Sequence, residues 1–177
     1  MNILAISGST RQTSTNTAFI EAIKIAAPKN INISIYRALG DFPIFSADLE
    51  GIKTPKIIQD FTEQVRLADG LLISSPEYVH AIPGGLKNAI DWLVSSDAII
   101  AKPVVLAHAS HRGDDMLQSL RLVLQTVTNG FNEDLFLRVP LMSKTAEEIK
   151  SILNDQNEVL AIQNFLNEFA LSARKPA

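Results

Sequence analysis

Two short segments of this sequence carry residue types suited to ligand binding, and the first lies near the amino terminus. Residues 7–16 read SGSTRQTSTN, in which hydroxyl side chains dominate, with one guanidinium and no acid. An apolar run at residues 2–6 precedes the segment, and residues 17–27 follow it with apolar positions at helical spacing. A helix N-terminus has unpaired N–H groups and a dipole that attract anions, and the Arg11 fork fits phosphate oxygens. The segment therefore predicts a phosphate site, although a plain turn with a serine or threonine N-cap remains an alternative.

The second segment, residues 75–85, reads SPEYVHAIPGG. Its two prolines restrict the backbone, and the pair Gly84-Gly85 allows the chain to approach another surface closely. Tyr78 offers a flat π-face beside the predicted phosphate site, and the backbone N–H groups around it are suited to the polar edge of a ring. The alternative is that Tyr78 packs against the protein and the glycines only seat a helix on a sheet.

The elements that must position these segments alternate along the chain. Short apolar or β-rich runs predict strands at residues 2–6, 32–36, 71–75, 103–109 and 132–139, the last polar enough to be a sheet edge. Helical spacing predicts helices at residues 17–27, 56–67, 83–93, 114–128 and 157–171, and a short helix or turn at 144–150. Residues 38–55 hold several turn formers and predict a long loop of the kind found at functional sites or interfaces.

Because the strands read as apolar runs between helices, we expect an α/β fold with a parallel five-stranded sheet covered on both faces. No linker or repeat divides residues 1–177, so the expectation is one domain. With strand order 2-1-3-4-5, a ligand lies beyond the carboxyl ends of the strands, between strands one and three. The segments 7–16 and 75–85 follow those two strands and should hold whatever this protein binds.

Composition excludes several classes of function. Apolar residues make up 46% and charged residues 20% of the chain, and the net charge of −3 offers no reason to expect nucleic acid or an anionic membrane as partner. The absence of cysteine excludes disulfides, thiolate metal sites and a cysteine nucleophile. With no signal peptide or apolar run of transmembrane length in view, we expect a soluble, cytoplasmic protein.

Both segments resemble signatures of one known family. Residues 8–16 resemble the G-S-x-R-x-x-S-x-N phosphate loop of the NAD(P)H-dependent FMN reductases, a family that includes quinone, azo-dye and chromate reductases. Residues 76–93 are similar to its second signature, P-E-Y-N-x-x-x-P-G-x-L-K-N-A-I-D-W, in the same order along the chain. The resemblance weakens after Gly113.

The resemblance implies a flavodoxin-like three-layer fold, non-covalently bound FMN, and hydride transfer from NADH or NADPH through the flavin to a small-molecule acceptor. It implies that the flavin carries the chemistry in ping-pong turnover, without a catalytic residue from the protein. The residues that it implies around the FMN phosphate are Ser9, Arg11, Ser14 and Asn16, with Thr10 and Thr17 close by. Those that it implies around the ring are Pro76, Glu77, Tyr78 and Val79, with Ser110 and Gly113 on the other side. Residues 42–49 resemble the family's dimer-contact segment, which the helix from Leu86 would join, so a homodimer or a dimer of dimers is expected.

Two positions depart from the family pattern. Val79 stands where the family more often has asparagine; it keeps the backbone donor but loses a side-chain amide near the flavin. His111 and Arg112 replace expected small residues and would suit a phosphate of the nicotinamide cofactor, but a solvated surface loop is the favoured interpretation.

Other classes lack their required residues. The first segment has no lysine for a P-loop and only one of the three glycines of a dinucleotide fingerprint. The acidic residues of a receiver domain and the Gly-x-Ser-x-Gly of a hydrolase are also missing. The histidines at 80, 108 and 111 do not predict a metal site, because His108 lies in an apolar strand and no acid flanks the three closely. The remaining alternative is a non-enzymatic flavodoxin-like electron carrier or redox sensor, which the modest net charge and the second signature disfavour.

Overall fold

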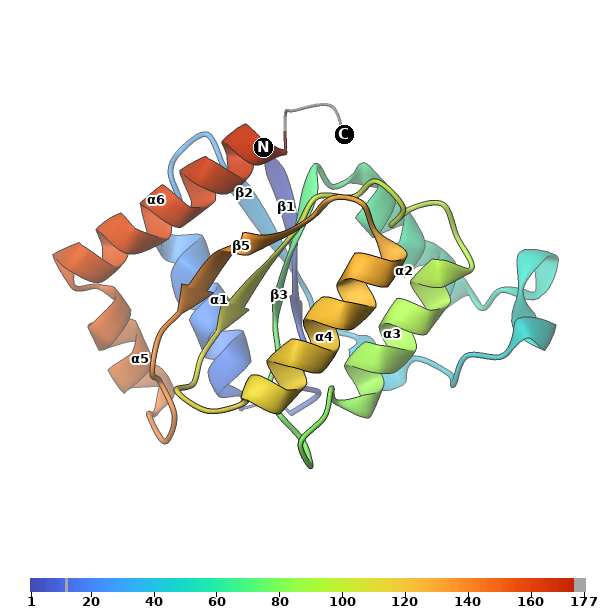
Figure 1. Cartoon of the computed structure of the whole chain (residues 1–177), viewed down its shortest axis with the longest axis horizontal. Helices are drawn as coiled ribbons and strands as arrows, with labels where there is room; N and C mark the ends of the chain where they lie inside the picture. The colour runs from blue at the N-terminus through green and yellow to red at the C-terminus, as the bar shows by residue number, and fades with distance from the viewer. Residues whose placement is uncertain (12, 174–177) are drawn as a thin grey trace.

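The centre of the structure is a five-stranded parallel sheet with strand order β2-β1-β3-β4-β5 (Figure 1). The computed structural model describes residues 1–11 and 13–173, so Gln12 of the first segment lies outside the described residues. The strands are β1 (Asn2–Ser7), β2 (Asn32–Tyr36), β3 (Gly70–Ser74), β4 (Val104–His108) and β5 (Phe131–Arg138). The predicted strand order is confirmed, and β5, the most polar strand, lies at an edge as expected.

Helices cover both faces of the sheet, which confirms the three layers. They are α1 (Thr15–Ala26), α2 (Lys56–Leu67), α3 (Gly84–Val94), α4 (Asp114–Val127), α5 (Ala146–Leu153) and α6 (Gln156–Ser172). One apolar core joins the sheet to α2, α3 and α4, and a second joins it to α1, α5 and α6 (Figure 1). β3 and β4 are buried along their whole length, because each lies between two strands and two helical layers.

Two helices differ from the sequence prediction by more than one residue at an end. Helix α1 begins at Thr15 rather than at residue 17, because Ser14 serves as its N-cap and accepts a hydrogen bond from the Thr17 N–H. The segment predicted as a short helix or turn contains helix α5. It begins after Thr145, which forms a reciprocal capping box with Glu148.

The predicted loop at residues 38–55 forms an arm that projects from the body of the molecule (Figure 1). It contains three short 3₁₀ turns, η1 (Leu39–Asp41), η2 (Ala47–Leu49) and η3 (Gly51–Lys53). Helix α3 holds its base, because Asn88 and Trp92 both donate to the Pro43 carbonyl, at 2.9 and 2.8 Å, and the Phe45 N–H donates to Asn88 at 2.8 Å. The projection therefore leaves the body from an ordered base.

The carboxyl ends of β1 and β3 lie side by side. Ser7 of β1 is in register with Ser74 of β3, and the Gly8 N–H donates to the Ser74 carbonyl at 2.8 Å. A Cβ at Gly8 would lie 2.4 Å from Ser75 Oγ and 2.8 Å from Ser75 Cβ, so only glycine fits between the two chains. The two segments singled out in the sequence therefore leave the sheet next to each other. No helix within residues 1–11 and 13–173 has the length and hydropathy needed to cross a membrane.

Candidate functional site

The hydroxyls of the first segment organise its own backbone. Ser7 Oγ accepts hydrogen bonds from the Ser9 N–H at 3.4 Å and from Thr17 Oγ1 at 3.0 Å, while Ser9 Oγ accepts from the Arg11 N–H at 3.3 Å. The first turn of α1 contains no acidic residue. The helix N-terminus therefore keeps its positive end free of a carboxylate, as an anion site requires.

A cavity of ≈ 530 Å³ lies over this segment. Of the predicted phosphate residues it brings together Ser9, Arg11, Ser14, Asn16 and Thr17, and Pro76 and Tyr78 line it from the second segment. Thr10 does not line this cavity; it lines an adjoining hollow of ≈ 280 Å³ with Tyr36 and Arg37. The donors of the first segment and the ring of Tyr78 thus face a common space, with Ser9 Oγ and Tyr78 Oη 3.5 Å apart.

Asn16 also has a structural role. It is 7% exposed, and its carboxamide oxygen accepts a hydrogen bond from the Ser74 hydroxyl at 2.9 Å. This bond ties the first turn of α1 to the end of β3. The residue therefore holds the two halves of the site together as well as lining the cavity.

Glu77 faces a second cavity, but its carboxylate is engaged within the protein. Oε2 accepts a hydrogen bond from the Met116 N–H at 3.0 Å, in the first turn of α4. A carboxylate at this position satisfies a free N–H and the helix dipole. Glu77 thereby fixes the second segment to α4.

The tip of the second segment is a strained turn. Tyr78 and Ala81 exchange two backbone hydrogen bonds of 3.1 Å, and the residues between them, Val79 and His80, have φ of 53° and 58°. Positive φ at both central positions is typical of a type I′ turn, and a β-branched residue there is a conformational outlier. Val79 is 95% exposed and is absent from the residues that line the three cavities around the site. Its departure from asparagine thus acts on the backbone conformation of the turn.

The third wall is the loop between β4 and α4. A cavity of ≈ 310 Å³ is lined there by Pro76, Glu77, His108, Ser110, Arg112 and Gly113, among others. This cavity adjoins the ≈ 530 Å³ cavity, since Thr15, Asn16 and Pro76 line both. The structure therefore brings Ser110 and Gly113 together with Pro76 and Glu77 around one cavity.

His108 lies beneath this loop and is 2% exposed. Its Nε2 lies 2.5 Å from the carbonyl oxygen of Arg112, which can only accept, so Nε2 carries the proton. Nδ1 is buried with no hydrogen-bond partner among the described residues. Burial is the main cause that lowers the pKa of His108, and the positive charge of Arg138 lowers it further against the opposing effect of the bond to Arg112. The imidazole is therefore a neutral group near pH 7.

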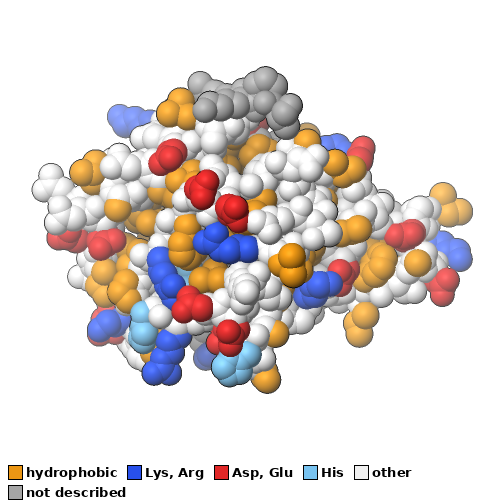
Figure 2. Space-filling model, viewed as in Figure 1, with side chains coloured by type: hydrophobic (Ala, Val, Ile, Leu, Met, Phe, Trp, Pro, Cys, Tyr) orange, Lys and Arg blue, Asp and Glu red, His pale blue; other side chains and the backbone are white. Residues whose placement is uncertain are grey.

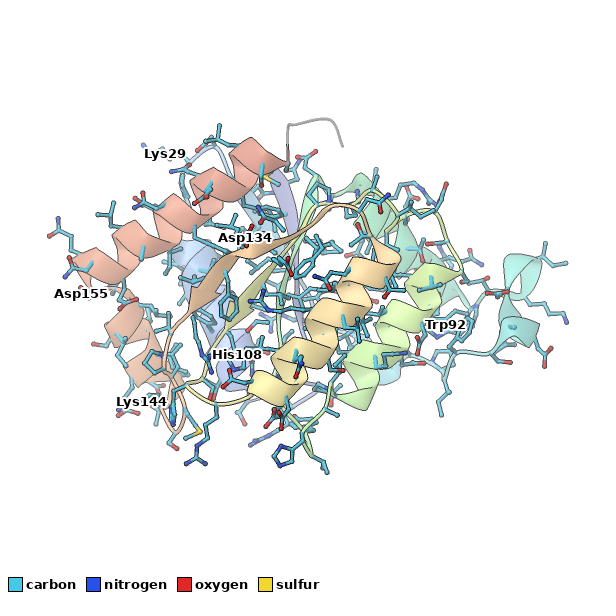
Figure 3. All side chains as sticks on the ribbon, in the orientation of Figure 1. Lys29, Trp92, His108, Asp134, Lys144 and Asp155 are labelled. Carbon is cyan, nitrogen blue, oxygen red and sulfur yellow. The ribbon has the colours of Figure 1, made fainter. Side chains whose placement is uncertain are left out.

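Lys144 and Thr145 complete the ≈ 530 Å³ cavity from the loop between β5 and α5. Nothing in the sequence near these residues indicates a ligand, because the T-x-x-E pattern of residues 145–148 predicts only a helix start. Figure 3 shows Lys144 and His108 toward the same end of the sheet, the end at which the strands finish. Figure 2 shows Lys, Arg and His side chains gathered at this end, with acidic side chains among them.

The expectation that no acid flanks the histidines closely is wrong for His80, which has two acidic neighbours, Glu77 three residues earlier in the chain and Asp115 from α4. Candidate ligand atoms of Glu77, His80 and Asp115 all lie within 4.8 Å of one another. His80 Nδ1 is 2.6 Å from an Asp115 oxygen, and Glu77 is bonded to α4 as described. These contacts anchor the second segment to α4, so each of the three side chains has a structural partner.

Val79→Asn is expected to raise the free energy of unfolding by about 1 kcal/mol, because asparagine tolerates the left-handed region better than a β-branched residue. Urea denaturation measures the change. Val79→Thr is the matched control, since it adds polarity but keeps the branch, and no gain is expected. Equal gains in the free energy of unfolding in both variants would assign the effect to loss of an exposed apolar side chain. That result would contradict backbone strain at Val79 as the cause.

The lowered pKa of His108 predicts a pH dependence of stability. Below the ordinary value of 6.5 the unfolded chain binds a proton that the folded protein binds only at lower pH, so stability falls as the pH drops through this range. Urea denaturation between about pH 7.5 and 5 should show a steeper loss in the wild type than in His108→Gln. His111→Gln controls for loss of an exposed imidazole, and parallel profiles of wild type and His108→Gln would contradict the assignment.

Sequence comparison identifies relatives of this protein. Residues 1–132 match the family model described as NADPH-dependent FMN reductase. A quinone reductase of Escherichia coli (strain K12) is 34% identical over 115 residues, covering 62% of this chain and 60% of the relative. An NAD(P)H-dependent FMN reductase of Pseudomonas aeruginosa is 37% identical over 92 residues, covering 52% of this chain and 49% of the relative. The matches thus span less than two thirds of either relative's length.

Solved structures share the whole fold. The flavoenzyme NAD(P)H:(acceptor) oxidoreductase FerB from Paracoccus denitrificans superposes with a TM-score of 0.75 at 19% identity, covering 97% of this chain and 96% of that one. The apo form of the NADH:FMN oxidoreductase EMOB has a TM-score of 0.65 at 21% identity, covering 99% and 91%. The fold is therefore flavodoxin-like. Since the family model covers most of the chain, including both cavity-lining segments, this protein belongs to the NADPH-dependent FMN reductase family, which uses FMN and NAD(P)H.

Proposed function

We propose that this chain is an FMN-dependent oxidoreductase that transfers hydride from NADH or NADPH through bound FMN to small acceptors such as quinones, azo compounds, metal oxyanions or free flavin. The observation that supports this most directly is the meeting of the two family signatures at adjoining cavities of ≈ 530 and ≈ 310 Å³. Cavities of this size suit a cofactor with a phosphate at one end and a flat ring at the other.

The first segment suits the phosphate. Ser14 caps α1, and the first turn of this helix, which contains no acidic residue, lines the ≈ 530 Å³ cavity. Arg11 lines the same cavity and offers a guanidinium to phosphate oxygens. A phosphate monoester there would meet both the helix dipole and a fixed positive charge.

The second segment suits the ring. Pro76 and Tyr78 line the cavity beside the phosphate end, and Pro76 with Ser110 and Gly113 lines the adjoining cavity. FMN supplies the hydride chemistry when bound, while these residues bind and orient its ring. The protein contributes geometry and electrostatics, so no side chain is assigned as a proton donor or acceptor in the main step.

Arg11→Ala is expected to weaken FMN binding about ten- to hundredfold and to leave riboflavin binding almost unchanged, because only FMN carries the phosphate. Titration of the apo-protein by flavin fluorescence gives both dissociation constants. Lys24→Ala, in the last turn of α1, removes the same charge away from the site and serves as the control. Equal losses for FMN and riboflavin would refute the phosphate assignment.

Turnover is expected to be ping-pong, since one flavin face must serve the nicotinamide cofactor and the acceptor in turn. Initial rates measured against NAD(P)H at several quinone concentrations should give parallel double-reciprocal lines. Intersecting lines would refute this order. Tight FMN binding with no loss of the flavin absorbance on addition of NADH or NADPH would instead favour the electron carrier or redox sensor.

Residues 42–49, within the arm, are proposed as the contact surface of a homodimer or a dimer of dimers. Helix α3 holds its base, yet Ile44 is 85% exposed in the single chain. Light scattering is expected to give a dimer or tetramer mass, and Ile44→Asp should shift it toward the monomer because burying a charge at an interface is costly. Leu160→Asp, on the exposed surface of α6, should leave the mass unchanged; a monomeric wild type would refute the proposal.

A further inference from the structure

Two side chains outside both family signatures, His108 and Arg138, hold the loop between β4 and α4 from the ends of the strands. It runs over residues 109–113, and Ser110, Arg112 and Gly113 line the ≈ 310 Å³ cavity. Within the loop the Arg112 N–H donates to Ser110 Oγ at 3.0 Å, and the Ser110 hydroxyl makes a weak contact of 4.0 Å with Met142 Sδ. Its conformation therefore depends on contacts from the sheet beneath it.

His108, the last residue of β4, makes the first of these contacts. Its Nε2–H donates to the Arg112 carbonyl at 2.5 Å, which draws the end of the loop down onto the imidazole. Gly113 then crosses directly over the ring with φ of 97°. A Cβ at Gly113 would lie 2.9 Å from Nε2 and 3.0 Å from Cε1, so only glycine can pack this closely against the imidazole.

Arg138, the last residue of β5, makes the other contacts. It is in register with His108 on the neighbouring strand. Its guanidinium donates to the carbonyls of Ser110 and Arg112, at 2.7 and 3.2 Å, and to the Asp114 carboxylate at 2.8 Å. Two side chains from adjacent strand ends thus converge on the Arg112 carbonyl and span the whole cavity-lining loop.

His108 is a polar side chain buried at the end of a strand, where an apolar side chain would avoid the cost of desolvation. What histidine offers and an apolar residue lacks is the donor to Arg112, that is, control of the loop. A loop held in one conformation before binding lowers the ordering cost when a ligand binds.

We propose that His108 and Arg138 are positioning residues that preorganise the Ser110–Gly113 wall for the isoalloxazine ring of FMN. The inference rests on the proposed function and adds that different residues determine the affinity for the two ends of the cofactor. Arg11 and the first segment determine affinity for the phosphate end, while the His108–Arg138 pair determines affinity for the ring end. The pair acts through the backbone carbonyls of Ser110 and Arg112.

The test compares FMN and riboflavin binding to Arg138→Met and His108→Leu by fluorescence titration of the apo-proteins. Each substitution removes donors to the loop, so both ligands should bind about tenfold more weakly, with the ratio of the two dissociation constants unchanged. His108→Gln and Arg138→Lys, which can still donate to a carbonyl, should recover part of the affinity. Arg121→Met is the matched control, because Arg121 also donates to a backbone carbonyl, that of Glu133 at 2.7 Å, away from the cavities.

The outcomes separate this inference from the proposed function. Unchanged affinity for both flavins in Arg138→Met and His108→Leu, with only a lower melting temperature, would overturn the positioning role. A loss for FMN alone would also overturn it, since the pair would then act on the phosphate end. Failure of the wild type to bind FMN would overturn the proposed function itself. If His108→Leu does not fold, Arg138→Met decides the question, because the Arg138 side chain is 32% exposed and methionine retains most of its apolar stem.

Discussion

The close approach of the chain at Gly8 to the chain at Ser75 is the contact on which the site depends. β1 and β3 are adjacent in the sheet although helices and another strand separate them in sequence. Their ends are joined by the bond from the Gly8 N–H to the Ser74 carbonyl, at a spacing that leaves no room for a Cβ. Because of this contact, the hydroxyl-rich segment and the tyrosine-bearing segment face one cavity instead of two separate surfaces.

Several side chains of the site hold the protein together as well as lining its cavities. Asn16 ties α1 to β3, Glu77 ties the second segment to α4, and His108 with Arg138 ties the third loop to the sheet. Each contact joins a loop to a neighbouring regular element, so the loops inherit the rigidity of the sheet and helices. A site built in this way keeps its geometry without a ligand, which is what tight binding of a rigid ring requires.

Some features of the site were open to prediction and others were not. The hydroxyls, Arg11 and the proline and glycine positions signal their roles through residue type and local spacing, so both segments could be identified from the sequence. The sequence indicated at Val79 only the loss of a side-chain amide, whereas the structure places this residue in a turn with positive φ, which only the backbone conformation reveals. Lys144, Thr145 and Arg138 could not be assigned because their sequence neighbours carry no ligand pattern.

The sequence by itself predicted the α/β fold class and the places of the strands and helices, because periodicity, turn residues and helix caps are local properties of the chain. The tertiary structure decided which polar groups form hydrogen bonds inside the protein and which remain available to a ligand. Thus the carboxylate of Glu77 accepts from α4, the amide oxygen of Asn16 accepts from Ser74, and Nε2 of His108 donates to the Arg112 carbonyl. Those outcomes depend on which strand ends meet across the sheet, and hydrogen bonds between residues far apart in sequence leave no periodic pattern from which to predict them.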